Sequence, residues 1–234
     1  MQKTGMAADA VSAPRRRAGE EVAEGHLSDF AYNRLLDLML AGELKPGSAL
    51  QERKIAQMLE ISRTPVREAL FRLEAEALIV RRPERQLVVA DIGLENYVRL
   101  LDLRRILEVE AAGRATGHVS AEKAAEVEQA IDALLGANHV TSAQHWAVDD
   151  LVHQSIAEAA GNPVLAQSIL DLRRRTHIFN TSRISHRLEP GGTEHRALIR
   201  ATAGTDAALS RRLMGEHLDN VRDAIVDYLL GIRR

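Results

Sequence analysis

Apolar residues recur at helical spacing near the start of the chain and predict three short helices followed by a β-hairpin. The helices are expected over residues 27–41, over 51–59, and from Ser62 or Thr64, either of which can cap the third helix, to Glu76. In that third helix Val66, Leu70 and Leu73 share one face, which we expect to be buried. Two short apolar runs, 79–82 and 87–90, predict the strands of the hairpin. This order of elements is typical of a winged helix–turn–helix.

The rest of the chain repeats a helical pattern of apolar residues between glycine breaks. Six helices are expected, over residues 94–116, 121–136, 142–160, 163–182, 192–203 and 205–230. Helices joined by such short connections favour an antiparallel bundle. The expected fold is therefore mainly α, with an N-terminal winged helix–turn–helix followed by an antiparallel all-α helical bundle.

The same pattern divides the chain into three parts. Residues 1–26 mix small and charged residues without a sustained apolar period, which predicts a disordered tail. Residues 27–90 form the expected winged helix–turn–helix domain, and residues 91–234 form the expected helical domain.

Composition narrows the class of protein. The 234 residues are 45% hydrophobic and 27% charged, as in an ordinary globular protein, and only 3% are aromatic. The sequence contains no cysteine, which excludes a disulfide scaffold, thiolate metal ligands and a cysteine nucleophile. No apolar run is long enough to span a membrane and no signal peptide is recognised, so we expect a cytoplasmic protein without a membrane partner.

The third predicted helix carries arginines on its polar face. The formal net charge of −2 does not mark the whole chain as a nucleic-acid binder, so the local placement of charge matters more. Arg63 and Arg67 lie four residues apart and therefore stack on one face, opposite the apolar stripe. An arginine in the major groove can hydrogen-bond both O6 and N7 of guanine, which favours DNA as the ligand. The alternative is that these arginines form surface ion pairs with Glu60 and Glu68.

The most specific motif runs from Ser62 to Leu70 and reads Ser-Arg-Thr-Pro-Val-Arg-Glu-Ala-Leu. With the preceding Glu52-Arg53 pair and the Pro46-Gly47 turn, it resembles the DNA-binding head of GntR-type transcription regulators. The resemblance implies that the DNA contacts come from Arg53, Arg63, Thr64 and Arg67.

Two positions of the head depart from that family pattern. The expected wing tip, residues 83–86, lacks the glycine that the family commonly has there. In its absence Arg85 is the wing residue that we expect to contact the DNA backbone. Phe71 stands where the family helix is commonly polar, and we interpret it as a residue that packs on the second domain.

The helical domain holds a carboxylate and three imidazoles that form a candidate metal site. Asp149 and His153 lie four residues apart on one predicted helix, whereas His195 and His217 belong to two later helices. Such a set suits a divalent transition metal that keeps a coordination position open. Each histidine alone is more often a core or surface residue, so the spacing by itself leaves both interpretations open. The other histidines show no clear pattern of partners: His26, His118, His139, His145, His177 and His186.

Several sequence motifs in this region resemble those of the FCD domain, the effector domain of the FadR branch of GntR regulators. These motifs are Leu103-Arg104 with Glu108, Asp149 with His153, Gly161-Asn162-Pro163, Glu194-His195 and His217-Leu218. In the metal-binding members one Asp and three His hold the ion. The resemblance therefore implies that Asp149, His153, His195 and His217 bind a divalent ion such as zinc, nickel or manganese.

The resemblance also implies an effector, which in such domains is typically a small organic acid. Arg104 either faces the effector pocket or pairs with Glu108 one turn on, and both roles hold if Glu108 orients the arginine. The stretch 173–181, which includes Asn180 and Thr181, adds further polar groups near the expected pocket.

These expectations combine into a transcription regulator, expected to be a repressor rather than an enzyme. It is expected to bind an inverted-repeat operator as a homodimer, with effector binding and dimerisation assigned to residues 91–234. A small organic or sugar acid at the metal-containing pocket would change its operator affinity. The alternatives are a metal-dependent hydrolase or isomerase that uses the Asp/His site, and a structural DNA-packaging protein. The helix–turn–helix argues against the first, and the small local charge excess argues against the second.

Overall fold

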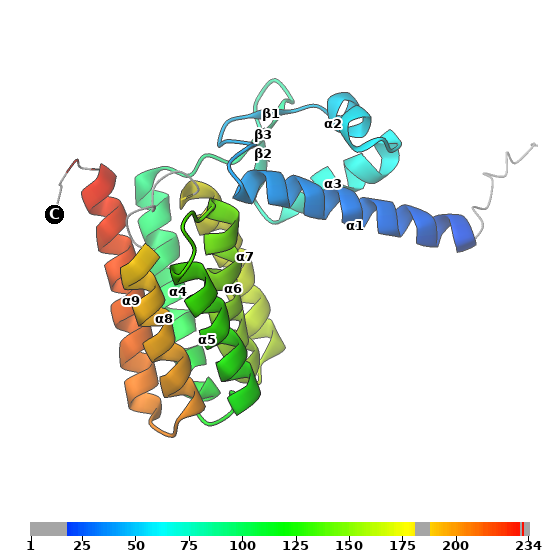
Figure 1. Ribbon diagram of the computed structural model, residues 1–234. Coiled ribbons are helices and arrows are strands. Elements are labelled where there is room, and N and C mark those ends of the chain that lie inside the picture. The colour runs from blue at the N-terminus through cyan, green and yellow to red at the C-terminus, as the bar shows by residue number, and fades with distance from the viewer. Residues whose placement is uncertain (1–17, 181–187, 230, 232–234) are drawn as a thin grey trace, which may run out of the picture.

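The head and the bundle are separate domains (Figure 1). The structure, a computed structural model, describes residues 18–180, 188–229 and 231. The head contains six elements: α1 (Ala18–Leu40), β1 (Ala49–Leu50), α2 (Glu52–Leu59), α3 (Arg63–Ala75), β2 (Ile79–Arg81) and β3 (Leu87–Val89). The strands form an antiparallel sheet in the order β1-β3-β2, in which Val88 faces Ala49 on one side and Val80 on the other. The head therefore has the helix–turn–helix and wing that the pattern predicted.

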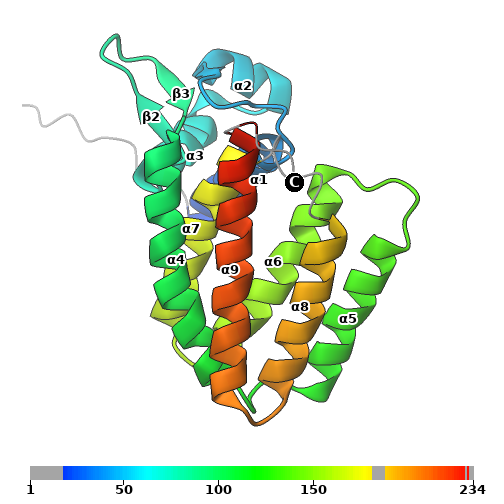
Figure 2. The ribbon, with the colours of Figure 1, turned by 90° about the vertical axis from the view of Figure 1, so that its left-hand side faces the viewer.

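Six further helices form the bundle in the described part of the chain. They are α4 (Leu94–Ala115), α5 (Ala121–Leu135), α6 (Ser142–Ala159), α7 (Pro163–Asn180), α8 (Leu188–Ala203) and α9 (Ala207–Leu229). The helices run up and down beside one another, and the head lies over one end of them (Figure 2). Helix α4 packs against α6, α7 and α9, while α5 packs against α6 and α8. The expected fold class, mainly α with a winged head and a helical bundle, is confirmed.

The bundle core is built from the apolar faces that the periodicity marks. Its largest cluster joins side chains of α5, α6, α8 and α9, among them Val127, Ile131, Val152, Ile156, Leu198 and Leu218. None of the described helices is both long and apolar enough to cross a membrane.

Two helix boundaries differ from the sequence prediction by more than two residues. Helix α1 begins at Ala18 and not at residue 27, so residues 18–26 of the expected tail are helical. Their two alanines and three glutamates are strong helix formers and outnumber the two glycines, Gly19 and Gly25. Helix α8 begins at Leu188 and runs through Gly191 and Gly192, which the prediction treated as a break. A Cβ on Gly192 would lie 3.0 Å from a methyl group of Leu135, so this glycine permits close packing of α5 on α8.

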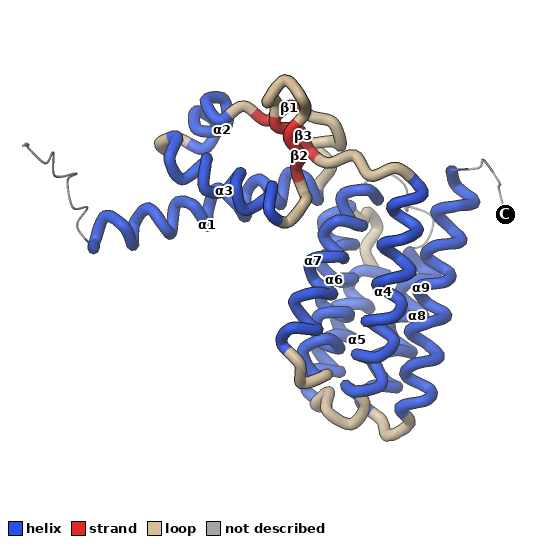
Figure 3. The backbone as a smooth tube through the Cα atoms, turned by 180° about the vertical axis from the view of Figure 1, so that it is seen from behind, coloured by secondary structure: helices blue, strands red, loops and turns tan. Residues whose placement is uncertain are grey.

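The head rests on the bundle through α1 and the end of α7. Helix α1 lies across the end of the bundle next to α6 and α7 (Figure 3). Ile178 of α7 is buried within the hydrophobic core of the head, together with Leu35, Leu70 and Leu73. The two domains therefore share apolar packing at α7.

Candidate metal centre and nucleic-acid interface

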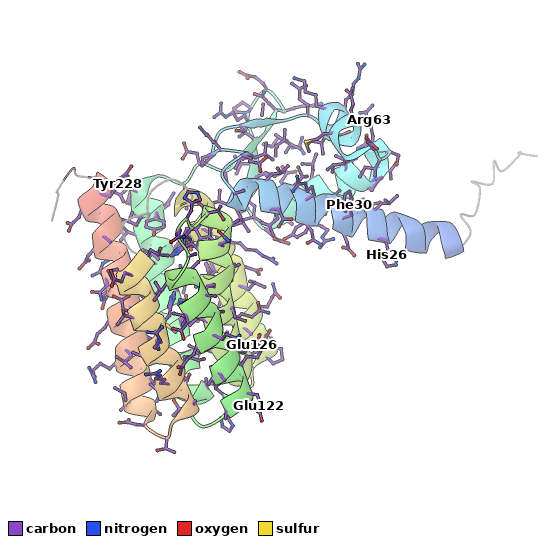
Figure 4. The ribbon with its side chains drawn as sticks, in the orientation of Figure 1. His26, Phe30, Arg63, Glu122, Glu126 and Tyr228 are labelled. Atoms are coloured by element: carbon purple, nitrogen blue, oxygen red, sulfur yellow. The ribbon has the colours of Figure 1, made fainter. Side chains whose placement is uncertain are left out.

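The exposed face of α3 presents the two arginines that the sequence singles out. Arg63 and Arg67 keep 61% and 63% of their side chains exposed, and Figure 4 shows Arg63 projecting from the head away from the bundle. Helix α3 begins directly after the short α2, so its first turn stands at the free end of the head. A side chain there can reach a duplex without any movement of the bundle.

Both arginines hydrogen-bond one carboxylate. Arg63 Nη2 and Arg67 Nη2 each lie 3.1 Å from Glu52 Oε2, and Arg67 Nε lies 3.3 Å from Glu52 Oε1. The hydrogen bond from Arg67, with that from Arg63, holds the pKa of the Glu52 carboxyl below its ordinary value. The arginines therefore do form ion pairs, but with the first residue of α2 rather than with Glu60 or Glu68. The shared carboxylate keeps the two guanidinium groups side by side.

The other predicted DNA contacts lie on the same domain. Arg53 is exposed on α2, and Thr64 is half-buried in the first turn of α3. Arg85 is exposed at the wing tip with a φ of 60°, the left-handed conformation that usually requires glycine. Arg85 therefore adopts a strained left-handed conformation that a glycine would adopt without strain. Phe71 is 73% exposed, so the interpretation that it packs on the second domain is wrong.

The bundle interior brings together the predicted metal ligands from three helices. Asp149 and His153 come from α6, His195 from α8 and His217 from α9, and one ligand atom of each lies within 4.8 Å of all the others. All four side chains are buried. The sequence therefore identified residues that the fold does place in one cluster.

The spacing of the ligand atoms can be compared with that around a metal ion. His153 Nε2 lies 3.2 Å from His217 Nε2, and Asp149 Oδ1 lies 3.2 Å from His195 Nε2 and 3.9 Å from His153 Nε2. Ligand atoms about 2.0–2.1 Å from a tetrahedral ion are about 3.3 Å apart. His195 Nε2 is buried without a hydrogen-bond partner, as expected for an atom that awaits a ligand. The four residues fit a divalent ion.

Two carboxylates outside the cluster orient its imidazoles. Glu108 Oε2 lies 2.5 Å from His153 Nδ1, and Glu194 Oε2 lies 2.8 Å from His217 Nδ1. Since a carboxylate only accepts, each Nδ1 carries the proton and each Nε2 turns a lone pair to the cluster. Burial lowers the pKa of His153 and of His217, so both rings stay neutral at pH 7. Neutral imidazole is the form that binds metal.

A buried arginine that the sequence analysis did not single out lies beside this cluster. Arg173 of α7 is 2% exposed, and its Nη2 lies 2.5 Å from Asp149 Oδ2 and 2.8 Å from Asp150 Oδ1. Burial alone would raise the pKa of Asp149, but Arg173, His177 and His195 hold it well below its ordinary value. The signal in the sequence was the Asp149-Asp150 doublet, since two adjacent carboxylates on a buried helix need a cation nearby.

His177 shows no clear pattern of partners in the sequence, and the structure supplies them. Its Nε2 lies 3.1 Å from Asp149 Oδ2 and 3.3 Å from Arg173 Nη2, while its ring stacks on Trp146 at 4.2 Å. The four-residue spacing of Arg173 and His177 places both on one face of α7, which periodicity alone could have shown. Of the further polar positions expected here, Thr181 and the side chain of Asn180 lie outside the described residues.

Arg104 forms the ion pair that the sequence offered as one of its two roles. Its Nε donates to Glu108 Oε1 at 2.7 Å, and its Nη1 donates to Thr176 Oγ1 at 2.9 Å, all within the buried interior. Although burial opposes the charged form, Arg104, His153 and Arg173 hold the pKa of Glu108 well below its ordinary value. Glu108 therefore joins the guanidinium of Arg104 to a ring of the cluster.

A cavity of about 400 Å³ opens between α6 and α7. Arg173 and Asp150 line it beside the cluster, and Gln154, Glu158, Asn162 and Gln167 supply polar groups farther along it. Cavities of this size accommodate small organic molecules.

Two family models match the chain. The model described as "Bacterial regulatory proteins, gntR family" matches residues 27–89, and the model described as "FCD domain" matches residues 99–220. The chain is 27% identical over 221 residues to the Uxu operon transcriptional regulator of Escherichia coli (strain K12), covering 82% of this chain and 84% of that protein. It is 28% identical over 217 residues to the HTH-type transcriptional regulator LutR of Bacillus subtilis (strain 168), covering 80% and 95%.

Among solved structures, E. coli McbR/YncC superposes with a TM-score of 0.73 at 24% sequence identity, covering 86% of this chain and 98% of that one. At that identity the likeness shows the fold.

The buried ion pairs predict a large cost for removing Glu108. The change Glu108→Gln leaves Arg104 charged and buried without its counter-charge, so we expect a loss of about 3–5 kcal/mol in the free energy of unfolding. Glu110→Gln, on the same helix but in an exposed ion pair with Arg114, should cost about 0–1 kcal/mol. Urea unfolding followed by circular dichroism compares the two, and equal losses would contradict the role of Glu108.

Proposed function

The chain belongs to the gntR family of bacterial regulatory proteins, carries an FCD domain and is a transcription regulator, and from this premise we propose how it works. It is a repressor that binds an inverted-repeat operator as a homodimer in the cytoplasm, where the DNA lies. A small organic or sugar acid binds at a metal-containing pocket in the bundle and changes its operator affinity. The observation that carries the proposal is the convergence of Asp149 with three histidines beneath a head whose arginines face outward.

The head supplies the DNA contacts. Arg63 and Arg67 enter the major groove from the first turns of α3, and Arg53 and Thr64 contact the adjacent backbone. Arg85 extends from the wing to a second stretch of backbone. The pairing with Glu52 supports this role, because it holds two guanidinium groups on one carboxylate that guanine or phosphate can replace.

The bundle supplies the effector site. Asp149, His153, His195 and His217 hold one divalent ion, for which zinc, nickel and manganese are the candidates. A divalent ion with one carboxylate and three neutral imidazoles keeps a net charge of about +1, which favours a carboxylate as the incoming ligand. Arg104 adds a second positive charge to the pocket, with Glu108 orienting its guanidinium.

Helix α7 connects the effector site with the head. Arg173 contacts Asp149, whereas the next residue, Arg174, donates to Tyr32 Oη at 3.2 Å and lies 3.5 Å from Glu76 Oε2. Tyr32 in turn donates to Glu76 at 2.6 Å, which links α1 to the end of α3. A ligand that favours one position of α7 therefore favours one position of the head, and by linkage changes its affinity for DNA. The helix–turn–helix head, residues 27–89, favours a regulator over the hydrolase or isomerase alternative.

The DNA role predicts that the two arginines of α3 control affinity. A duplex enriched by the wild-type chain from a random library serves as the ligand in anisotropy titrations at fixed salt. Arg63→Ala and Arg67→Ala should each cost about 1–3 kcal/mol in binding free energy. Arg200→Ala, an equally exposed arginine in an ion pair on α8, is the matched control and should leave the affinity unchanged. Unaltered affinity in both α3 variants contradicts the proposed interface.

The metal role predicts one divalent ion per chain. After reconstitution with zinc, nickel or manganese and removal of excess, elemental analysis should find about one equivalent of at least one metal. His195→Ala should lose that metal and the thermal stabilisation that binding confers, because a ligand of the folded state stabilises it by mass action. His118→Ala, an exposed histidine on the loop before α5, should retain both. Absence of metal from the wild-type chain with all three ions would overturn this part of the proposal.

A further inference from the structure

A second group of ligand atoms lies beside the candidate metal site and shares one residue with it. Asp149, Asp150 and His177 each offer one ligand atom within 4.8 Å of the others. Asp149 faces both groups, with Oδ1 near His195 Nε2 at 3.2 Å and Oδ2 near His177 Nε2 at 3.1 Å. The two groups of ligand atoms, which share the carboxylate of Asp149, thus resemble a two-metal centre with a bridging carboxylate.

The guanidinium of Arg173 already occupies the middle of this second group. Its Nη2 contacts all three ligand atoms, at 2.5 Å from Asp149 Oδ2, 2.8 Å from Asp150 Oδ1 and 3.3 Å from His177 Nε2. These are hydrogen-bond distances to a cation that is held by the chain itself. The stacking of Trp146 on His177 at 4.2 Å keeps the ring of that ligand in place.

We propose that Arg173 is the resident cation of this second position and that it limits the centre to one metal ion per chain. The inference rests on the proposed metal site at Asp149, His153, His195 and His217. Arginine keeps its charge at every pH at which the protein is folded, and a 2% exposed side chain does not leave its position readily. A second metal ion must therefore displace a permanently charged group from three partners.

The balance of charge around the cluster agrees with a single ion. Four carboxylates, those of Glu108, Asp149, Asp150 and Glu194, lie among two guanidinium groups, those of Arg104 and Arg173. Two carboxylate charges are left over, and a single divalent ion balances them. A second divalent ion beside Arg173 would add two more positive charges to a buried cluster, which is costly in a low-dielectric interior. Loss of the arginine charge removes that obstacle.

The experiment replaces the guanidinium by an uncharged side chain of similar length and counts metal ions. Wild-type chain, Arg173→Met and Arg174→Met are reconstituted with excess zinc, freed of unbound ions and assayed by elemental analysis. Wild type and Arg174→Met, whose arginine lies on the same helix but faces the head, should hold one zinc per chain. Arg173→Met should hold two, and the double variant Arg173→Met with His177→Ala should return to one.

The outcomes separate this inference from the proposed function. One zinc in both the wild type and Arg173→Met overturns the role of Arg173 and leaves the metal site standing. Two in the wild type also overturn it, whereas none in either protein overturns the metal site and the inference together. If Arg173→Met does not fold, Arg173→Gln, which keeps a polar group in contact with the carboxylates, provides the test. Arg173→Gln should hold two zinc ions per chain, and one zinc in this variant overturns the role of Arg173.

Discussion

The ion pair between Arg173 and Asp149 is the interaction on which the interior of the bundle depends. Both groups are buried, and a buried charge without a partner costs several kcal/mol. Arg173 compensates Asp149 and Asp150 from one side, and Arg104 compensates Glu108 from the other. This network allows five helices, α4 and α6 to α9, to place charged and imidazole groups in their shared interior. The metal-ligand cluster can be buried because the two arginines compensate most of its carboxylate charge.

The same network reaches the DNA-binding head through one helix. Successive residues of α7 face different partners, with Arg173 in the interior, Arg174 against Tyr32 and Glu76, and Ile178 in the head core. The Cζ atom of Arg72, near the C-terminal end of α3, also lies 4.2 Å from the centroid of the Tyr32 ring. Helix α3 therefore contacts Tyr32 at this end. A change at the cluster that shifts α7 therefore acts on the head without an intervening flexible linker.

Much of the fold and part of the site could be read from the sequence, and the rest depends on three-dimensional contacts. Helical periodicity and motif spacing placed Val66, Asp149 and His153 on the correct helices, because these signals are local. The alternative to DNA contact paired Arg63 and Arg67 with their sequence neighbours Glu60 and Glu68, whereas the fold supplies Glu52. His177 was missed for the same reason, because its partners Asp149 and Trp146 come from another helix. The helix break predicted at Gly191-Gly192 was wrong, because Gly192 lies within α8 and permits its close packing on α5.

The coupling of the effector site to the head through α7 is the central claim, and one measurement tests it directly. The affinity of the zinc-loaded chain for its enriched duplex is titrated against a panel of small organic and sugar acids, with wild type and Arg174→Ala in parallel. In wild type an acid that raises the thermal stability should also change DNA affinity, by about 5- to 150-fold. In Arg174→Ala the same acid should still stabilise the protein but no longer change DNA affinity. An undiminished change in the variant, or no change with any acid in wild type, contradicts the account.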